Sequence, residues 1–188
     1  MTASRKALAE QKPAESDAVL VDRICSGDRA ALGSLFDRHA AALHQFVRRA
    51  APREDPDDIV QEAFIRVTRA AAGYQQRSDS ARSWLFGIGY AIVRERRRAS
   101  ARLTRALARF AGFEAQRSVT PKGAVRTEIE RHLDALDPQK REVVILTEML
   151  GMTGPEAAAI LDIPVGTVWT RLHHARRELR ESLEKSDV

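Results

Sequence analysis

Apolar side chains recur at intervals of three and four residues along most of the chain, and this spacing is typical of helices that bury one face. The pattern is clear in two blocks, residues 17–107 and residues 125–188. No stretch of useful length alternates apolar and polar residues as a half-buried strand would. We therefore expect an all-α protein in which each block forms its own helical core.

Residues that can cap a helix mark helix starts in both blocks. Asp28 follows Gly27, and Asp55 and Asp137 each precede a proline. An aspartate at the N-cap accepts hydrogen bonds from free backbone N–H groups, and proline is well tolerated at the first helical position. The sequence thus predicts helices that begin just after these three aspartates.

The composition divides the chain into four segments. Residues 1–16 are polar and charged, and we expect them to be a disordered tail. Residues 108–124 have no clear period and contain Gly112, Pro121 and Gly123, which interrupt regular structure. We expect two small helical domains, residues 17–107 and 125–188, joined by a flexible linker that lets them move independently.

The end of the second block has the pattern of a helix-turn-helix. A short helix is expected after Thr153, and a tight connection at Asp162 to Pro164 leads to a long helix that begins near Val165. Its apolar stripe is formed by Val168, Leu172, Ala175 and Leu179. Its opposite face carries Trp169, Thr170, His173, His174 and Arg177. Donors and cations on that face fit a recognition helix in the major groove. The periodicity alone fits an ordinary amphipathic helix with a solvated basic face equally well.

Composition and charge favour an anionic partner. The 188 residues carry a formal net charge of +5, and 44% of them are hydrophobic. A basic balance favours nucleic acid first and an anionic membrane surface second. No stretch approaches the ~18 uninterrupted apolar residues of a membrane helix, and the N-terminus has no apolar signal segment. We therefore expect a cytoplasmic protein without membrane insertion.

The sequence has no pattern that would support catalysis, metal binding or a disulfide. The histidines have no metal-ligand spacing with each other or with Cys25, and there is no phosphate-binding glycine loop or nucleophile paired with a base. Cys25 is the single cysteine, so no internal disulfide can form, and we expect it to be a small buried residue. We expect neither an enzyme nor a cofactor or metal site.

The first block carries two charged surfaces. Asp58, Gln61, Glu62 and Ile65 fall at i, i+3, i+4 and i+7 and share one helix face, which fits either a protein-binding surface or a solvated acidic face. Further along, Glu95 is the only acid between Arg94 and Arg109. The arginines of this run are Arg94, Arg96, Arg97, Arg98, Arg102, Arg105 and Arg109. Phosphate neutralisation is the natural use of such a run.

Three motifs of the second block carry a family resemblance. They are Leu136-Asp137-Pro138-Gln139-Lys140-Arg141-Glu142-Val143, Pro164-Val165-Gly166-Thr167-Val168 and Arg171-Leu172-His173-His174-Ala175-Arg176. This part of the chain resembles region 4 of the extracytoplasmic-function (ECF) sigma factors of bacterial RNA polymerase, which reads the minus-thirty-five promoter element. The resemblance implies base contacts by Trp169, Thr170, His173 and His174, and phosphate contacts by Arg171, Arg176 and Arg177. Trp169 departs from the family, which usually has Lys or Arg there.

Two motifs of the first block resemble region 2 of the same family. Asp58-Ile59-Val60-Gln61-Glu62-Ala63-Phe64 is similar to the segment that grips the clamp helices of the polymerase, and Ser83-Trp84-Leu85-Phe86-Gly87-Ile88 is similar to the segment that supports the melted minus-ten strand. The resemblance implies core-polymerase contacts by Asp58, Gln61, Glu62 and Ile65. It implies downstream-element contacts by Tyr74, Ser83, Trp84, Tyr90, Arg94, Arg97 and Arg98. Unstacked bases need such aromatic platforms and cations. Ala91, Glu95 and Tyr90 depart from residues common in the family.

Three functions compete for this sequence. The first is a sigma factor that binds core polymerase (clamp helices and flap) and promoter DNA, helps to melt the promoter and pairs with an anti-sigma factor. The second is a stand-alone helix-turn-helix regulator whose first domain senses or dimerises. The third is an enzyme or a membrane-surface protein. The acidic face at Gln61 and Glu62 beside an arginine-rich helix favours the first, because a sensor domain has no need of it.

Overall fold

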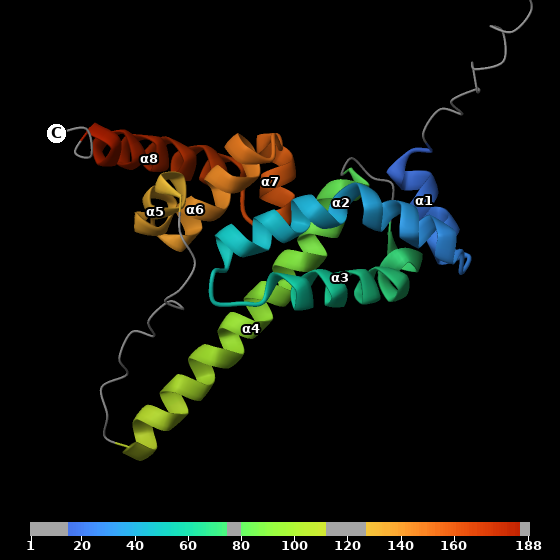
Figure 1. Cartoon of the computed structure of the whole chain (residues 1–188), viewed down its shortest axis with the longest axis horizontal. Coiled ribbons are helices and arrows are strands. Elements are labelled where there is room, and N and C mark those ends of the chain that lie inside the picture. Colours follow the sequence, from blue (N-terminus) through green and yellow to red (C-terminus); the bar gives the residue numbers. More distant parts are fainter. Residues whose placement is uncertain (1–14, 75–79, 112–126, 185–188) are drawn as a thin grey trace, which may run out of the picture.

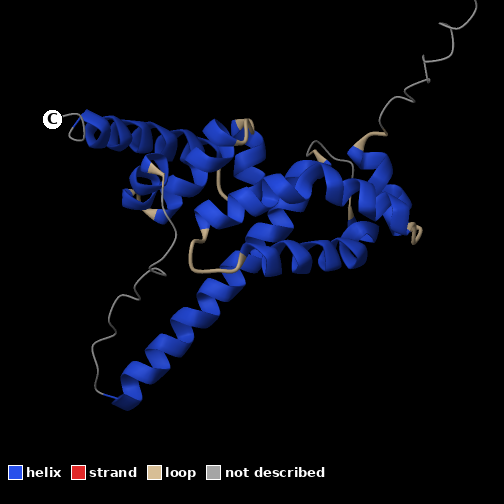
Figure 2. Ribbon diagram, in the orientation of Figure 1, coloured by secondary structure: helices blue, strands red, loops and turns tan. Residues whose placement is uncertain are grey.

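The computed structural model describes residues 15–74, 80–111 and 127–184, and every regular element within these ranges is helical (Figures 1 and 2). The N-terminal bundle holds α1 (Asp17–Cys25), α2 (Arg29–Ala50), α3 (Pro56–Ala70), the 3₁₀ turn η1 (Ala71–Gly73) and α4 (Ala81–Ala111). The C-terminal bundle holds α5 (Glu128–Ala135), α6 (Pro138–Val144), the π-helical turn η2 (Ile145–Met149), α7 (Gly154–Leu161) and α8 (Val165–Glu184). The predicted all-α class is confirmed.

The three helix starts predicted from aspartate are present. Asp28 caps α2, and Asp55 caps α3 by accepting a hydrogen bond from the backbone N–H of Asp57 at 2.9 Å. Asp137 caps α6 in the same way. Thr153 caps α7 in a reciprocal capping box with Glu156. Each cap satisfies donors that a helix N-terminus would otherwise leave free.

The core of the N-terminal bundle lies between α2, α3 and α4. Leu35, Leu43, Phe46, Ile59 and Leu85 are completely buried there. Burying one such side chain fully contributes about 1.5–3 kcal/mol relative to leaving it in water. These residues come from three helices whose polar faces point outward, so packing fixes how α3 and α4 present their surfaces.

The turn between α7 and α8 sets the angle at which α8 leaves α7. Asp162, the C-cap of α7, has a φ of +57°, in the left-handed region, which aspartate tolerates better than most residues. Pro164 and Val165 follow directly and begin the long helix. The buried residues of α8 are Val168, Leu172 and Ala175, as its apolar stripe predicts.

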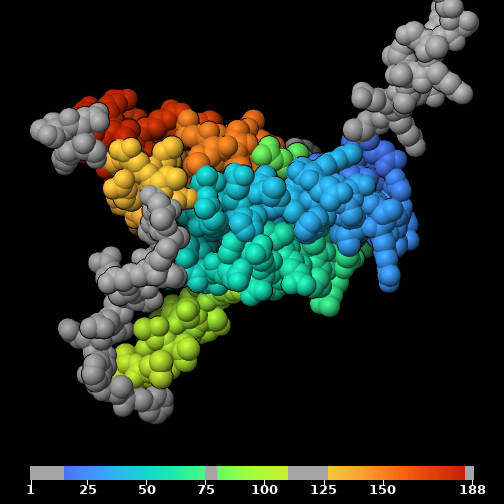
Figure 3. Space-filling view, in the orientation of Figure 1, coloured from blue at the N-terminus to red at the C-terminus, as the bar shows by residue number. Residues whose placement is uncertain are grey.

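The boundary of the N-terminal bundle differs from the one expected from composition. α4 continues through Ala111, four residues into the segment predicted to be linker, and residues 112–124 lie outside the described ranges. In the views of Figures 1 and 3, the last turns of α4 project beyond the rest of the N-terminal bundle. Residues 108–111 are alanine, arginine, phenylalanine and alanine, so nothing in them stops a helix.

The two bundles are in direct contact, which the linker composition does not predict. α7 packs against α4, and both α6 and η2 contact α2. The composition of a linker indicates how freely it allows two domains to move. Whether the domains contact each other depends instead on whether their surfaces are complementary. Here the arginines of α2 and α4 meet acidic side chains of the C-terminal bundle.

Two smaller expectations have different outcomes. Cys25, expected to be buried, is exposed at the end of α1, because Leu20, Val21 and Ile24 fill the buried face of that short helix. Among the described residues no helix is long and apolar enough to cross a membrane. Residues 1–14 of the predicted tail lie outside the described ranges, and Ser16 caps α1.

Candidate nucleic-acid interface

The outer face of α8 presents the residues predicted to contact an upstream DNA element. Trp169, Thr170 and His173 are exposed, and Arg171 and His174 are half-buried at the edges of that face. Val168 and Leu172 point into the core. The 3.6-residue period of α8 therefore separates a buried stripe from a donor-rich face, as a recognition helix requires.

Several of these side chains already have partners inside the C-terminal bundle. The hydroxyl of Thr170 donates to the carbonyl of Gly166 at 2.9 Å. Arg176 pairs with Glu148 at 2.5 Å, and Arg177 lies 3.8 Å from Glu181. These pairs are exposed, so each contributes little to stability and exchanges readily for a phosphate. His173 is exposed, and the centroid of its ring lies 5.7 Å from that of His174.

The start of α4 brings together two of the predicted aromatic residues. The rings of Tyr74 and Trp84 lie 5.1 Å apart at a tilt of 52°, and both are half-buried. Residues 75–79, between them in the sequence, lie outside the described ranges. The pair offers a partly exposed aromatic surface of the kind on which an unstacked base can lie.

Four other residues predicted to contact the downstream element are turned toward the C-terminal bundle. Ser83 and Tyr90 are 2% and 8% exposed, so neither is open to DNA in this arrangement. Ser83 donates to Glu156 at 3.3 Å, and the hydroxyl of Tyr90 donates to Glu142 at 2.8 Å. Arg94 contacts Asp162, and Arg97 pairs with Glu142.

Burial dominates the ionisation of Tyr90. It raises the pKa of the phenol well above its ordinary value, and the neighbouring Glu142 carboxylate raises it further, against a smaller lowering by Arg97 and Arg94. The phenol therefore stays neutral and remains a hydrogen-bond donor at neutral pH. Arg97 also donates to the backbone carbonyl of Ala50 at the end of α2, which fixes its guanidinium beside Glu142.

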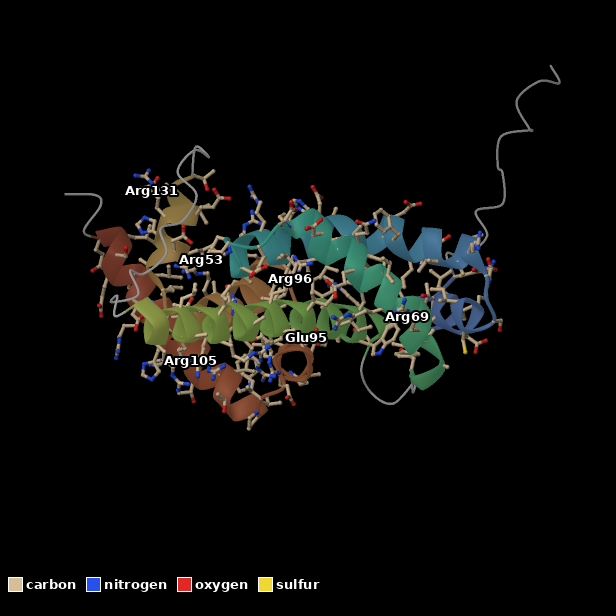
Figure 4. The ribbon with its side chains drawn as sticks, turned by 90° about the horizontal axis from the view of Figure 1, so that it is seen from below. Arg53, Arg69, Glu95, Arg96, Arg105 and Arg131 are labelled. Carbon is tan, nitrogen blue, oxygen red and sulfur yellow. The ribbon has the colours of Figure 1, made fainter. Side chains whose placement is uncertain are left out.

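Beyond Arg97, α4 carries an arginine stripe, defined as Arg98, Arg102, Arg105 and Arg109. Their spacing of four, three and four residues places them on one helix face, and all four are exposed. Within the described ranges none of them forms an ion pair with an acid, and the Arg105 side chain donates only to the carbonyl of Ala101. Figure 4 shows Arg105 toward the C-terminal end of α4. Only Arg98 of this stripe was predicted as a site residue.

The face of α3 predicted to bind polymerase is mostly open. Asp58, Gln61 and Ile65 are exposed, and the apolar side chain of Ile65 is 47% exposed. Glu62 is half-buried and accepts hydrogen bonds from Arg66 at 2.6 Å and from Arg96 at 3.0 Å. Burial alone would raise the pKa of Glu62, but these two guanidinium groups outweigh it and lower the pKa.

Glu95, which departs from the family pattern, has a structural role in the same network. Arg66 bridges Glu95 and Glu62, with a distance of 2.7 Å to Glu95. In Figure 4, Arg96 and Glu95 lie at the middle of α4, and Arg96 reaches Glu62 on α3. The ion pairs tie α3 to α4, so the candidate polymerase face and the candidate DNA helix form one unit.

Sequence reasoning missed the acidic side chains that cover the predicted DNA face of α4. Glu142, Glu156 and Asp162 come from α6 and the two ends of α7. Glu142 stands among buried apolar residues, and a buried carboxylate needs a partner. This was the one sequence signal that could have indicated a contact of Glu142 with another element. Within the described ranges no group of three His, Cys, Asp or Glu side chains is placed to hold a metal ion.

Two family models match the chain, one for each bundle. Residues 35–110 match the model described as sigma-70 region 2, and residues 126–179 match the model described as sigma-70, region 4. The two matches fall on the candidate polymerase and downstream-element surfaces and on the helix-turn-helix. Together they span more than half of the chain.

Curated relatives match over nearly their whole length. The RNA polymerase sigma factor CnrH of Cupriavidus metallidurans is 34% identical over 186 residues, covering 92% of this chain and 96% of that protein. The ECF RNA polymerase sigma-E factor of Escherichia coli (strain K12) is 32% identical over 183 residues, covering 90% of this chain and 95% of that protein.

Solved structures share the fold. CnrH in complex with the cytosolic domain of CnrY aligns with a TM-score of 0.67 at 34% identity, covering 91% of this chain and 99% of that one. RpoE of Bartonella quintana, crystallised with the anti-sigma factor NepR, aligns with a TM-score of 0.64 at 23% identity, covering 79% and 94%. The chain belongs to the sigma-70 family of RNA polymerase sigma factors, in its ECF group.

Proposed function

We propose that this chain binds core RNA polymerase, directs it to specific promoters and assists their melting. One observation supports this proposal most directly. One bundle presents a donor-rich recognition helix, and the other presents an aromatic pair and a basic helix. A stand-alone regulator needs the first feature only. The chain thus acts as an initiation factor of the cytoplasm and not as an enzyme.

The minus-thirty-five element is read by the outer face of α8. Trp169, Thr170, His173 and His174 face the bases in the major groove. Arg171, Arg176 and Arg177 hold the flanking phosphates, the last two after exchanging Glu148 and Glu181 for DNA. The exposure of Trp169, Thr170 and His173 beside the buried Val168 and Leu172 supports this orientation.

The minus-ten element is held at the start and along the length of α4. Tyr74 and Trp84 provide the surface on which an unstacked base lies. Arg94, Arg97 and Arg98 neutralise the phosphates of the melted strand, and Ser83 and Tyr90 add hydrogen-bond donors. In the present arrangement Arg98 is exposed and the Tyr74–Trp84 pair is partly exposed, whereas Ser83 and Tyr90 act only after the C-terminal bundle has moved away.

The polymerase is bound through the face of α3. Asp58, Gln61 and Ile65 provide an acidic and apolar surface for the clamp helices, and Glu62 contributes from within its arginine network. The C-terminal bundle binds the flap. A surface that combines carboxylates with a single exposed isoleucine has the mixed polarity of a non-obligate interface.

An anti-sigma factor is the proposed regulator. CnrH, at 34% identity, is seen in complex with the cytosolic domain of CnrY. We propose that a partner of the same kind binds this chain and withholds it from polymerase.

Run-off transcription with purified core polymerase tests the function. The holoenzyme should retain a defined set of sequences from a randomised promoter library and initiate transcription on them, while core polymerase alone does not. If the chain binds DNA of defined sequence without core and does not stimulate initiation with it, the stand-alone regulator is the correct function.

A further inference from the structure

The arginines of α4 differ in their partners on the two sides of Arg97. Arg94, Arg96 and Arg97 each contact an acidic side chain outside α4. The arginine stripe begins at the next residue, Arg98, and within the described ranges none of its members forms an ion pair with an acid. It lies on the last turns of α4, which project beyond the N-terminal bundle (Figure 1). The stripe therefore has no role in joining the elements that the structure describes.

Four cations on one helix face also destabilise that helix. Members of the stripe are three or four residues apart, the spacing at which helical side chains are neighbours and like charges repel each other. The stripe extends over roughly 17 Å, since an α-helix rises about 1.5 Å per residue. A cluster that costs stability and has no acidic partner among the described residues indicates an anionic ligand outside the chain.

The acid next to the stripe is already neutralised. Glu95 precedes Arg98 by one helical turn, but its two carboxylate oxygens accept hydrogen bonds from Arg66 of α3 at 2.9 and 2.7 Å. Hydrogen bonding to Arg66 is the largest influence on the pKa of Glu95 and lowers it, whereas the charge of Arg98 lowers it least. Glu95 is thus held by α3, and Arg98 remains available to a ligand.

Small side chains border the stripe. Ala101 lies to one side of it and Ala99 and Ala106 to the other, each about 70–90° around the helix, and all three are exposed. Methyl groups leave room for a long anionic molecule to lie along the guanidinium groups. Leu103 and Leu107 are exposed on the opposite side of the helix, so no flat lipid surface meets both the leucines and the arginines.

The position of the stripe along α4 selects the DNA that it can reach. The stripe follows Trp84 by roughly 20–40 Å of helix, which corresponds to roughly 6–11 base pairs at 3.4 Å per base pair. The next described element after α4 is α5, the first helix of the bundle that carries α8. The stripe end of α4 therefore leads toward the minus-thirty-five element, and the DNA on that side of the minus-ten element is double-stranded.

We propose that the arginine stripe binds backbone phosphates of the duplex spacer directly upstream of the minus-ten element. Guanidinium groups pair with phosphate through two parallel hydrogen bonds, and such contacts fix register without reading sequence. The spacer duplex is thus held at one end of α4 while the melted strand is held at the other. The inference rests on the proposed function, because it takes the Tyr74–Trp84 pair as the site of the unstacked base.

Two templates that differ only in duplex length test the site. Both carry a minus-ten element retained from the promoter library and lack the minus-thirty-five element, and they have about 4 and about 14 base pairs of upstream duplex, respectively. An exposed charge pair contributes roughly a factor of two to five, so the parent holoenzyme should bind the longer template about ten-fold more tightly. Arg102→Ala with Arg105→Ala should lose most of this gain. Equal affinity of the parent for both templates would overturn the proposal.

A matched control and a second readout identify the phosphates. Arg29→Ala with Arg131→Ala removes the same charge at exposed positions of α2 and α5 and should keep the parental gain. In the parent, a methylphosphonate roughly 6–11 base pairs upstream of the unstacked base should weaken binding about two- to five-fold. The Arg102 and Arg105 variant should not respond to it. If that variant is weaker by the same factor on both templates, the stripe holds the melted strand and the proposal is wrong.

Other partners give different results. The Arg102 and Arg105 variant should bind core polymerase as tightly as the parent, and a loss of core affinity would assign the stripe to the polymerase. Vesicles of phosphatidylglycerol and phosphatidylcholine should retain parent and variant equally; retention that depends on the two arginines, with equal binding of the two templates, would assign the stripe to a membrane. A parent holoenzyme that initiates run-off transcription but does not distinguish the templates contradicts only this inference, whereas failure to initiate contradicts the proposed function.

Discussion

The indole ring of Trp169 lies against Gly154 so closely that no larger residue fits there without displacing it. A Cβ atom at Gly154 would lie 2.3 Å from Cζ2 and 2.8 Å from Cη2 of Trp169. The start of α7 therefore positions the most unusual residue on the outer face of α8. Trp169 is still 51% exposed, so one side of the ring packs on α7 and the other remains open to a ligand.

Gly154→Ala should move the indole without unfolding the domain. The clashing atoms are the far end of a side chain that can rotate, so the indole can move aside without displacing the backbone. We expect a shift of Trp169 fluorescence in a Trp84→Phe background and a melting temperature within a few degrees of the parent. Gly166→Ala, with no atom near its Cβ position, is the control; an unchanged spectrum in Gly154→Ala would contradict the packing.

Trp169→Arg should change which upstream sequences the holoenzyme selects. Indole has one donor and no acceptor, so it cannot make the bidentate contact to guanine that arginine makes. We expect a gain of guanine at one position of a randomised minus-thirty-five element and generally tighter DNA binding from the added cation. An identical base profile in the two proteins would mean that Trp169 only packs on Gly154 and that specificity depends on Thr170, His173 and His174.

Gln61→Ala with Ile65→Ala should weaken binding to core polymerase. Both side chains are exposed on α3 and neither supports the core, so the variant should keep its helical circular dichroism, since such surface changes usually cost within about 0.5 kcal/mol of stability. We expect about a ten-fold or greater loss of affinity in a binding titration with core. Val19→Ala, which truncates a 46% exposed apolar side chain on α1, is the matched control, and equal affinity of the two variants would argue against this face.

The stability contribution of Glu62 should disappear in acid. Its folded-state pKa lies below the ordinary value of 4.5, so the contribution is present above that pH and is lost as the pH falls through the folded value. At pH 7, Glu62→Gln should lower the free energy of unfolding by about 1 kcal/mol or less, because the pair is partly exposed and screened. Urea titrations of the parent and of Glu62→Gln at pH 7 and pH 3 check this. If the two proteins still differ in their free energy of unfolding at pH 3, the shape of the side chain, and not its charge, explains the effect.

Arg102→Ala with Arg105→Ala should reduce the salt dependence of promoter binding. Within the described residues Arg102 and Arg105 form no ion pair with an acid, and each phosphate contact contributes about 0.9 to the slope of log K against log salt. Loss of two contacts should make the holoenzyme slope less steep by roughly 2. Leu103→Ser with Leu107→Ser, exposed on the opposite side of the same turns, should leave the slope unchanged, and a parental slope in the arginine variant would show that the stripe faces away from DNA.

The sequence by itself determined where three helices begin and which face of α8 is buried, because both depend on neighbours within a few turns. Aspartates before proline or before an apolar repeat predicted the starts of α2, α3 and α6, because a helix cap is made with residues two and three positions away. The period of α8 placed Val168 inside and Trp169 outside for the same reason. The motifs around Asp58, Ser83 and Leu136 were sufficient to indicate the family.

Tertiary structure alone decided which of these surfaces are free. Tyr90 and Arg97 belong to the DNA set by sequence, yet they meet Glu142, which lies 52 residues after Tyr90 in the chain. Gly154 and Trp169 are likewise joined only by the turn that brings α8 back onto α7. Local periodicity determines which side chains share a helix face, but it does not determine which other segment covers that face. Charge and shape complementarity decide this, between segments that meet only after folding.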